Sequence, residues 1–203
     1  MPQIYKKIMP KINRAGQAKV LTKAEMSKLF KAFRHDDHRL IFAICRYTAE
    51  RVGAVLKLTP LDVYDAKGKI RPILTFRGNT RKGSNHKPGK TRQVPVHPSL
   101  AELLASYPVN LKGKFLFPSP RDETKPLTIQ SADLALRTAC DRAGLGDKGI
   151  STHSFRRTAI TELAKSGVSV RVIQKITGHA KLEQLSTYIE VSEEEVIAAL
   201  ESL

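Results

Sequence analysis

The most informative stretch of the sequence begins with a histidine and an arginine, His153 and Arg156, three positions apart. On a helix this spacing makes two side chains neighbours on one face, about 5–6 Å apart at Cβ. Ser151 or Thr152 can cap such a helix, which we expect to run to Ser166, so both side chains would lie in its first turn. Because the helix N-terminus favours an anion, an imidazole and a guanidinium there predict a phosphate-binding corner.

Two further side chains follow at a defined spacing. His179 comes directly after Gly178, which can end a short helix over residues 169–177, and Tyr188 stands nine positions after the histidine. A tyrosine hydroxyl is a weak nucleophile at its reference pKa of about 10, so it needs a base and a positive field beside it. Each fragment is common by itself, and only their order and spacing together distinguish them from ordinary surface and core residues.

The succession of H-x-x-R, G-H and a tyrosine nine positions later resembles the C-terminal motifs of the tyrosine recombinases, the phage integrase family. That family has a further catalytic arginine upstream, in a segment of the type T-G-x-R-x-x-E-L-L-x-L. The likeness covers nearly all of residues 21–203. The upstream segment is matched here at Thr48, Arg51, Val55, Leu56 and Leu58.

The resemblance implies a site that cuts DNA strands. Arg51 and Arg156 each present a bidentate fork to phosphate oxygens, and His179 adds a donor, so the three clamp the charge that grows in the transition state. Tyr188 is the implied nucleophile and His153 its base. The product is a 3′-phosphotyrosyl intermediate with a free 5′-hydroxyl. Because the bond energy is kept, another strand can be joined without ATP, metal or any other cofactor.

The leaving 5′-oxygen needs a proton, which the resemblance assigns to a lysine on the turn between two strands. The candidates are Lys82, Lys87 and Lys90, in a loop between strands expected at 70–76 and 91–96. We prefer Lys82, which directly follows the outgoing strand. The hairpin is longer than the family's usual turn, and this leaves the other two lysines open.

The same hairpin belongs to the most basic part of the chain. Residues 67–101 include nine Lys or Arg and no Asp or Glu. A run of charges is usually only a solvated surface, but in a chain of net charge +16 a cationic hairpin favours contact with a phosphate backbone. The predicted DNA-binding residues are Arg77, Arg81, Lys87, Lys90 and Arg92.

Two features depart from the family pattern. The family normally has Glu or Asp three positions after the first arginine, where it supports the active-site side chains, and this chain has Ala54. Glu50 would lie on another face of the helix, so we do not expect it to substitute. The family also usually has an N-terminal DNA-clamping domain, whereas only residues 1–20 precede the expected catalytic part. A minimal recombinase, an excised catalytic fragment and a partner that supplies the clamp all fit.

Bulk properties agree with a polyanionic partner. The 203 residues suit one compact domain, and the pI near 10.0 favours nucleic acid first and an anionic membrane surface second. No apolar run approaches the ~20 residues of a membrane span, and the N-terminus lacks the apolar region of a secretory signal. Cys45 and Cys140 are expected as buried free thiols. These features predict a cytoplasmic protein with no metal site, and the resemblance implies a protein of the prokaryotic nucleoid or one encoded by a mobile element.

The expected elements are mainly helical. Thr22 and Glu25 form a capping box for a first helix. Residues 62–64, with the two strands of the hairpin, predict a three-stranded antiparallel meander. The fold class is therefore mainly α with a small three-stranded antiparallel sheet, like the integrase catalytic domain, with residues 1–20 as a basic extension or linker remnant and 21–203 as the catalytic domain. Further helices are expected at 36–49, 51–58, 98–106, 128–143, 151–166 and 169–177.

The C-terminal segment differs from the rest in charge. After Lys181 the chain has six Glu residues and no Lys or Arg, and Ser192 with Glu195 forms a capping box for a short last helix. A helix this short is marginal alone, so it must dock. It either folds back onto its own domain or, as the resemblance implies, packs against a neighbouring subunit in a tetramer on paired DNA sites. Its apolar face comprises Val196, Ala199, Leu200 and Leu203.

The expected partners are double-stranded DNA and further copies of this chain, with no membrane; the free protein is compatible with a monomer. A type IB topoisomerase shares this chemistry but relaxes supercoils. A catalytically inactive integrase-like DNA-binding module is a second alternative, which Ala54 favours. An RNA-binding protein ranks last because no aromatic-rich strand motif of the K/R-G-F-G-F type is present.

Overall fold

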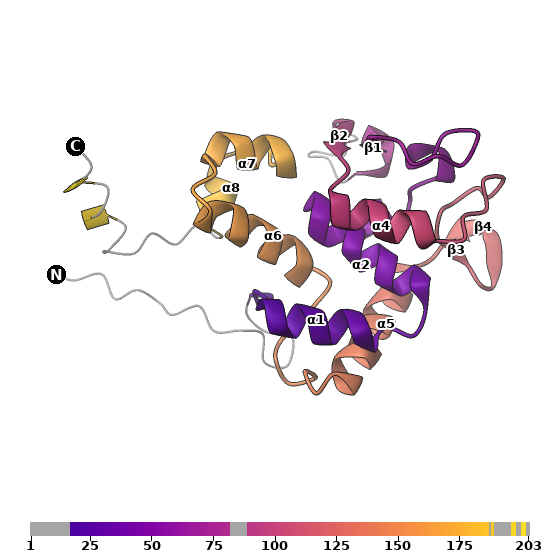
Figure 1. The fold of residues 1–203 in the computed structure, drawn as a ribbon, viewed down its shortest axis with the longest axis horizontal. Helices are drawn as coiled ribbons and strands as arrows, with labels where there is room; N and C mark the ends of the chain where they lie inside the picture. The colour runs from indigo at the N-terminus through magenta and orange to yellow at the C-terminus, as the bar shows by residue number, and fades with distance from the viewer. Residues whose placement is uncertain (1–16, 82–88, 187, 189–195, 198–199, 202–203) are drawn as a thin grey trace. The chain divides into compact units, whose positions relative to one another are not determined.

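The computed structural model of the chain describes residues 17–81, 89–186, 188, 196–197 and 200–201 (Figure 1). The chain divides into two compact units between Ala159 and Ile160. Helix α6 (Ser154–Lys165) carries the chain from the first unit into the second. The two units are described in turn.

Helices form the core of the first unit. Helix α1 (Lys23–Ala32) begins with the predicted capping box of Thr22 and Glu25, which is confirmed. Helix α2 (Asp36–Thr48) is its centre, because it buries every residue from Leu40 to Cys45 and contacts both α4 (Pro98–Ser106) and α5 (Ile129–Arg142). The free thiols of Cys45 and Cys140 are buried, as predicted. Burial raises the pKa of both thiols, that of Cys140 to about 12.

Aromatic side chains fix the start of α6 against this core. Phe155, the second residue of α6, stacks on Phe42 of α2 with ring centroids 4.7 Å apart, and meets Phe30 of α1 edge-on at 6.0 Å. Phe33 stacks in turn on Phe42 at 5.3 Å. Because such pairs stabilise beyond their buried area, the first turn of α6 is held in place, and with it His153 and Arg156.

The predicted three-stranded meander is wrong in its first strand. Strands β1 (Ile73–Phe76) and β2 (Arg92–Pro95) pair antiparallel with Leu74 opposite Val94, but residues 62–64 contribute only an isolated bridge from Tyr64 to Ile70. Pro60 and the Asp62 carboxylate, which accepts from the Thr59 N–H and hydroxyl, close a 3₁₀ turn, η1 (Pro60–Asp62), instead. A capped turn competes locally with an extended strand.

A second hairpin was not predicted from the sequence. Strands β3 (Pro118–Ser119) and β4 (Asp122–Pro126) pair antiparallel directly after Phe117, which is buried. The polar sequence of β4 has no alternation of apolar and polar residues, which is the signal used to recognise a strand. The described fold is therefore mainly helical with two small antiparallel sheets of two strands each.

The second unit is helical throughout its described part. Helix α7 (Val170–Thr177) begins at the cap Ser169 and ends at Gly178, whose φ of 67° is the left-handed exit that was predicted. Helix α8 (Glu183–Ser186) follows, and Ile160, Ile173 and Leu185 are buried. The predicted capping box of the last helix, Ser192 with Glu195, lies outside the described residues. No helix in the described residues has both the length and the apolar character needed to cross a bilayer.

Candidate active site

A tight turn at the end of α2 places the first group of candidate residues. Helix α2 ends at Thr48, and Ala49 takes the left-handed conformation with φ 51° and ψ 28°. The family pattern has glycine here, which adopts this conformation without strain. After the turn, Arg51 becomes the N-cap of α3 (Val52–Val55) rather than the first residue of the longer helix predicted at 51–58. The residue between, Glu50, therefore does not lie on a helix.

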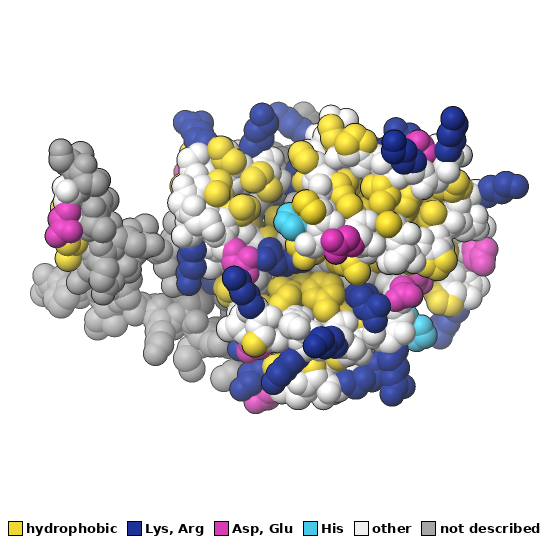
Figure 2. Space-filling model, in the orientation of Figure 1, with side chains coloured by type: hydrophobic (Ala, Val, Ile, Leu, Met, Phe, Trp, Pro, Cys, Tyr) yellow, Lys and Arg dark blue, Asp and Glu magenta, His cyan; other side chains and the backbone are white. Residues whose placement is uncertain are grey.

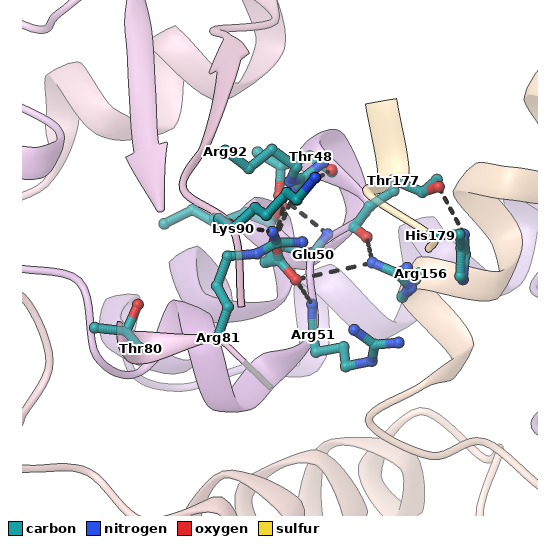
Figure 3. Close-up of polar contacts among 12 residues, drawn as sticks. Thr48, Glu50, Arg51, Thr80, Arg81, Lys90, Arg92, Arg156, Thr177 and His179 are labelled. Atoms are coloured by element: carbon teal, nitrogen blue, oxygen red, sulfur yellow. Dashed lines mark hydrogen bonds and ion pairs between the residues drawn. The ribbon is translucent and has the colours of Figure 1, made fainter. Parts of the chain in front are cut away.

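Glu50 accepts contacts from residues far apart in sequence (Figure 3). Its Oε1 accepts from the Arg51 N–H at 2.9 Å, and its Oε2 accepts from Arg81 Nε at 2.9 Å and Arg92 Nε at 3.0 Å. Arg156 Nη1 lies 3.8 Å from Oε1. Glu50, Arg92 and Arg156 are 1%, 6% and 3% exposed. The sequence reasoning did not expect Glu50 to support these side chains.

Backbone carbonyls at the C-terminus of α2 hold two of the same arginines. Arg92 Nη2 donates to the Thr48 carbonyl at 2.9 Å, and Arg156 Nη1 donates to the Ala49 carbonyl. The last carbonyls of a helix lack partners within it, and the dipole makes this end negative. Two guanidinium groups therefore satisfy carbonyls that the left-handed turn leaves open.

The electrostatics of the cluster keep its charges in place. Burial by itself raises the pKa of Glu50, but the charges of Arg92, Arg81 and Arg156 and the Arg51 N–H outweigh it, so the pKa lies below its ordinary value of 4.5. Burial lowers the pKa of Arg92 to about 10, against the attraction of Glu50. Glu50 and Arg92 are therefore both charged at neutral pH. Removing one partner of a buried pair costs about 3–5 kcal/mol.

A cavity of about 720 Å³ opens beside this cluster. Arg51, Arg81 and His153 line it together with apolar residues of α3 and α5, among them Ala54 and Ile129. Figure 3 shows the Arg51 side chain extending away from the Glu50 carboxylate. Within the described residues its guanidinium makes no hydrogen bond or ion pair. A half-buried guanidinium whose donors are not used by the described residues can donate two hydrogen bonds to a phosphate.

The two residues of the H-x-x-R motif lie in different surroundings. His153 is exposed, directly precedes α6 and lines the cavity, while Arg156 lies inside α6 and is buried against Ala49 and Glu50. The helix therefore starts two or three residues later than predicted. Both residues stay candidates for phosphate contact, His153 from the cavity wall and Arg156 from the Glu50 cluster.

The base of the basic hairpin is tightly built. Arg81 Nη1 donates to the Lys90 carbonyl at 2.6 Å, and the Gly89 N–H donates to the Arg81 carbonyl at 3.3 Å. A Cβ at Gly78 would lie 2.3 Å from the Gly89 carbonyl oxygen, so the close approach of the two sides requires glycine at this position. Lys82 and Lys87, two of the three candidate acids, lie outside the described residues; the Lys90 side chain is exposed.

Three predicted DNA contacts of the hairpin are arginines that the structure describes in ion pairs. Arg77 pairs with Asp62 at 3.0 Å and keeps 43% of its side chain exposed. Arg81 and Arg92 pair with Glu50 and are almost entirely buried. Their DNA contact stays a prediction, and their geometry indicates a different function, which is to hold the Glu50 carboxylate.

The second unit brings His179 and Tyr188 together. Their ring centroids are 5.9 Å apart at an interplanar angle of 40°. The Thr177 hydroxyl lies 2.7 Å from His179 Nδ1, and Gln174 Nε2 donates to the His179 carbonyl at 3.1 Å. These contacts fix the orientation of the imidazole. The second unit therefore places a half-buried tyrosine beside an oriented histidine, and the catalytic functions of both stay predictions.

Sequence reasoning missed the function of Glu50, although one signal was present. Residues 67–101 contain no acidic residue, so any arginine buried in that hairpin must find its carboxylate elsewhere, since buried charges are paired. Glu50 is adjacent to Arg51, which the motif already identified. The burial of Arg81 and Arg92, however, has no local signature.

The phage integrase family matches residues 19–195 of the sequence. The chain belongs to this family. The tyrosine recombinase XerD of Corynebacterium glutamicum is 30% identical over 183 residues, which are 83% of this chain and 55% of that protein. The chain spans between about half and three fifths of the length of the curated relatives it matches.

Solved structures of integrases share the fold. The catalytic domain of bacteriophage HP1 integrase matches 91% of this chain and 95% of that domain, with a TM-score of 0.64 and 22% identity. The Tn1549 transposon integrase, solved in complex with a circular intermediate DNA, matches 93% of this chain and 66% of that chain, with a TM-score of 0.72 and 16% identity. The integrase catalytic fold is therefore shown, and relatives of this fold have been crystallised on DNA.

Proposed function

We propose that this chain is the catalytic domain, over residues 21–203, of a site-specific tyrosine recombinase that cleaves and rejoins double-stranded DNA. The observation that carries the proposal is the Arg51 guanidinium, open toward a cavity that His153 and Arg81 also line. The proposal adds Arg156 as the second fork, His179 as a donor, Tyr188 as the nucleophile, His153 as its base and Lys82 as the acid. No metal or ATP takes part.

Charge supports a DNA substrate. The chain has a net charge of +16, and Lys and Arg side chains are spread over the described residues on the face shown in Figure 2, with acidic side chains scattered among them. Such a surface attracts a polyanion at long range. Specific contact would then depend on the cavity and on the basic hairpin, through Arg77, Lys87 and Lys90.

Denaturing electrophoresis with suicide DNA substrates tests the proposal. A nicked site loses its small cleaved fragment, so the covalent complex accumulates. We expect a protein–DNA adduct with the wild-type chain and none with Tyr188→Phe, whose affinity for the same DNA should stay within about twofold, because one hydroxyl is lost and little volume changes. The expected adduct is at the 3′-phosphate.

Other results would lead to other conclusions. DNA binding without an adduct favours an inactive DNA-binding module. An adduct with relaxation of supercoiled DNA that lacks any specific site favours a type IB topoisomerase. An adduct that persists in Tyr188→Phe would move the nucleophile to another tyrosine. Tyr107 is a poor substitute, because burial and its hydrogen bond to Asp37 raise its pKa above the ordinary value.

A further inference from the structure

We propose that Glu50 is the positioning carboxylate of this active site, and that it replaces the acidic residue which the family has at the position of Ala54. Resting on the proposed function, the inference assigns to one residue the geometry of the phosphate clamp. Glu50 itself does not touch the DNA. It acts through Arg156, Arg81 and Arg92, and through the backbone of Arg51.

The positions of Glu50 and Ala54 in the structure allow a carboxylate at one to replace a carboxylate at the other. Glu50 and Ala54 line the same cavity, Glu50 before α3 and Ala54 on it. Ala54 is buried and its methyl group accepts no hydrogen bond. A carboxylate at either position could reach the cavity wall where Arg51 and Arg81 lie. Glu50 lies between α2 and α3, and the left-handed turn at Ala49 directs its carboxylate into the interior.

The arrangement does more than neutralise a buried charge. Three guanidinium groups face a single carboxylate at 2.9, 3.0 and 3.8 Å, and like charges this close together repel one another. The single negative charge of Glu50 attracts all three guanidinium groups, and the cluster keeps a net positive charge. A phosphodiester that arrives at the open fork of Arg51 meets donors already fixed in place, which is the condition for electrostatic catalysis.

Glu50 also links the clamp to the hairpin. Arg81 and Arg92 stand on the two sides of residues 82–90, which contain all three candidate lysines, and both donate to the same oxygen of Glu50. Arg156 of α6 faces the other oxygen. A displaced carboxylate would therefore disturb the first arginine, the second arginine and the base of the hairpin together.

The test compares Glu50→Gln with the double variant Glu50→Gln/Ala54→Glu in the full chain. Glutamine keeps the size and can still accept from the Arg51 N–H, but it has no charge. On suicide substrates we expect Glu50→Gln to lower the single-turnover cleavage rate by about 100-fold, comparable to losing a transition-state donor, with DNA affinity within about threefold. The double variant should recover at least about tenfold, because it restores an anion to the same cavity.

A core variant separates positioning from loss of stability. Leu136→Ala removes a side chain that is buried on α5 and does not line the cavity, and it should lower Tm while its folded fraction cleaves at the wild-type rate. If Glu50→Gln does not fold, Glu50→Asp keeps the charge with a carboxylate one methylene shorter and should cleave at least about tenfold more slowly. A wild-type rate in either folded variant, or no recovery in the double variant, would overturn the inference.

A second readout does not depend on cleavage. The Nε–H groups of Arg81 and Arg92 donate to Glu50, so in protein labelled with ¹⁵N-arginine they should give resonances protected from exchange with water. Glu50→Gln should move these resonances and speed their exchange. If the Arg81 and Arg92 resonances of Glu50→Gln are the same as those of the wild type, the positioning function is overturned, whatever the cleavage rate of the variant. Absence of an adduct from the wild-type chain, with the resonances moving as expected, would instead count against the proposed function alone.

Discussion

At the scale of single residues, the main feature of this site is that one carboxylate, Glu50, faces three arginines. Glu50 pairs with Arg81, Arg92 and Arg156, and carbonyls at the end of α2 accept from two of these arginines. A carboxylate in such surroundings stays ionised well into acid. The decrease in the free energy of unfolding at acidic pH should therefore depend on the protonation of Glu50.

The pH dependence of unfolding checks this expectation. The pKa of Glu50 is lower in the folded chain than its ordinary 4.5, so the unfolded state binds the proton first as pH falls, and stability from this group is lost there. The difference in free energy of unfolding between wild type and Glu50→Gln should be constant from about pH 7 to 5 and shrink below about pH 4.5. Urea titrations at several pH values measure it. A difference that grows toward acid would contradict the sign.

At the scale of elements, the hairpin of β1 and β2 is anchored at its base, where Arg81 and Arg92 pair with Glu50. The contacts of Arg81 with Gly89 and Lys90 close this base, and Gly78 permits the close approach of the two chains. The anchoring predicts effects of substitution at the base and on the lysines beyond it.

Gly78→Ala should open the base of the hairpin. Its new Cβ would lie 2.3 Å from a backbone oxygen. Because a backbone atom cannot move away as easily as the end of a side chain, we expect the free energy of unfolding to fall by about 1–3 kcal/mol. Gly53→Ala is the matched control. Its nearest neighbour is the Ile129 Cδ1 atom at 3.2 Å, at the end of an exposed side chain. The control should change stability by less than about 0.5 kcal/mol, and equal effects would contradict the argument.

The general acid can be assigned with a sulfur substrate. If Lys82 protonates the leaving oxygen, Lys82→Ala should cleave ordinary DNA poorly, and a substrate with sulfur at the 5′-bridging position should restore much of the rate, because that leaving group needs no proton. The single-turnover rates of Lys82→Ala, Lys87→Ala and Lys90→Ala on both substrates make the comparison. Rescue of Lys90→Ala together with no rescue of Lys82→Ala would assign the acid to Lys90.

At the scale of the whole molecule, charge is divided unevenly along the chain. The residues after Lys181 have six Glu and no Lys or Arg, while the chain as a whole has a net charge of +16. In the described part of the last segment, Val196, Ile197 and Leu200 are each about half exposed or more, at 48%, 54% and 63%. We propose that this segment docks its apolar side on a neighbouring subunit, with its acidic turn against a basic surface.

Truncation after Ser192 tests the assembly. The shortened chain should stay folded and bind a single DNA site with unchanged affinity, but lose cooperative binding to two sites and strand exchange. Band shifts on DNA with one and two sites measure both. Aggregation or unfolding of the truncated chain would favour docking onto its own domain, and unchanged cooperativity would remove the segment from the assembly.

Local sequence determined the parts of this protein that neighbouring residues can decide. The capping box of Thr22 and Glu25 and the exit of α7 at Gly178 both follow from spacing over a few residues, and the structure confirms them. The linear motifs also identified the family. Their spacing is visible because each motif spans about ten consecutive residues or fewer.

Tertiary structure alone decided which charges meet. Glu50, Arg81, Arg92 and Arg156 come from a turn, the base of a hairpin, a strand and a helix, up to 106 positions apart in the chain. No periodicity links such residues, because their encounter depends on how α2, β2 and α6 pack. The strand predicted at 62–64 is absent for a local reason instead, because the Asp62 side chain caps a 3₁₀ turn at Thr59 and this turn competes with an extended strand. A buried arginine takes the nearest carboxylate in space, and packing rather than sequence sets that neighbour.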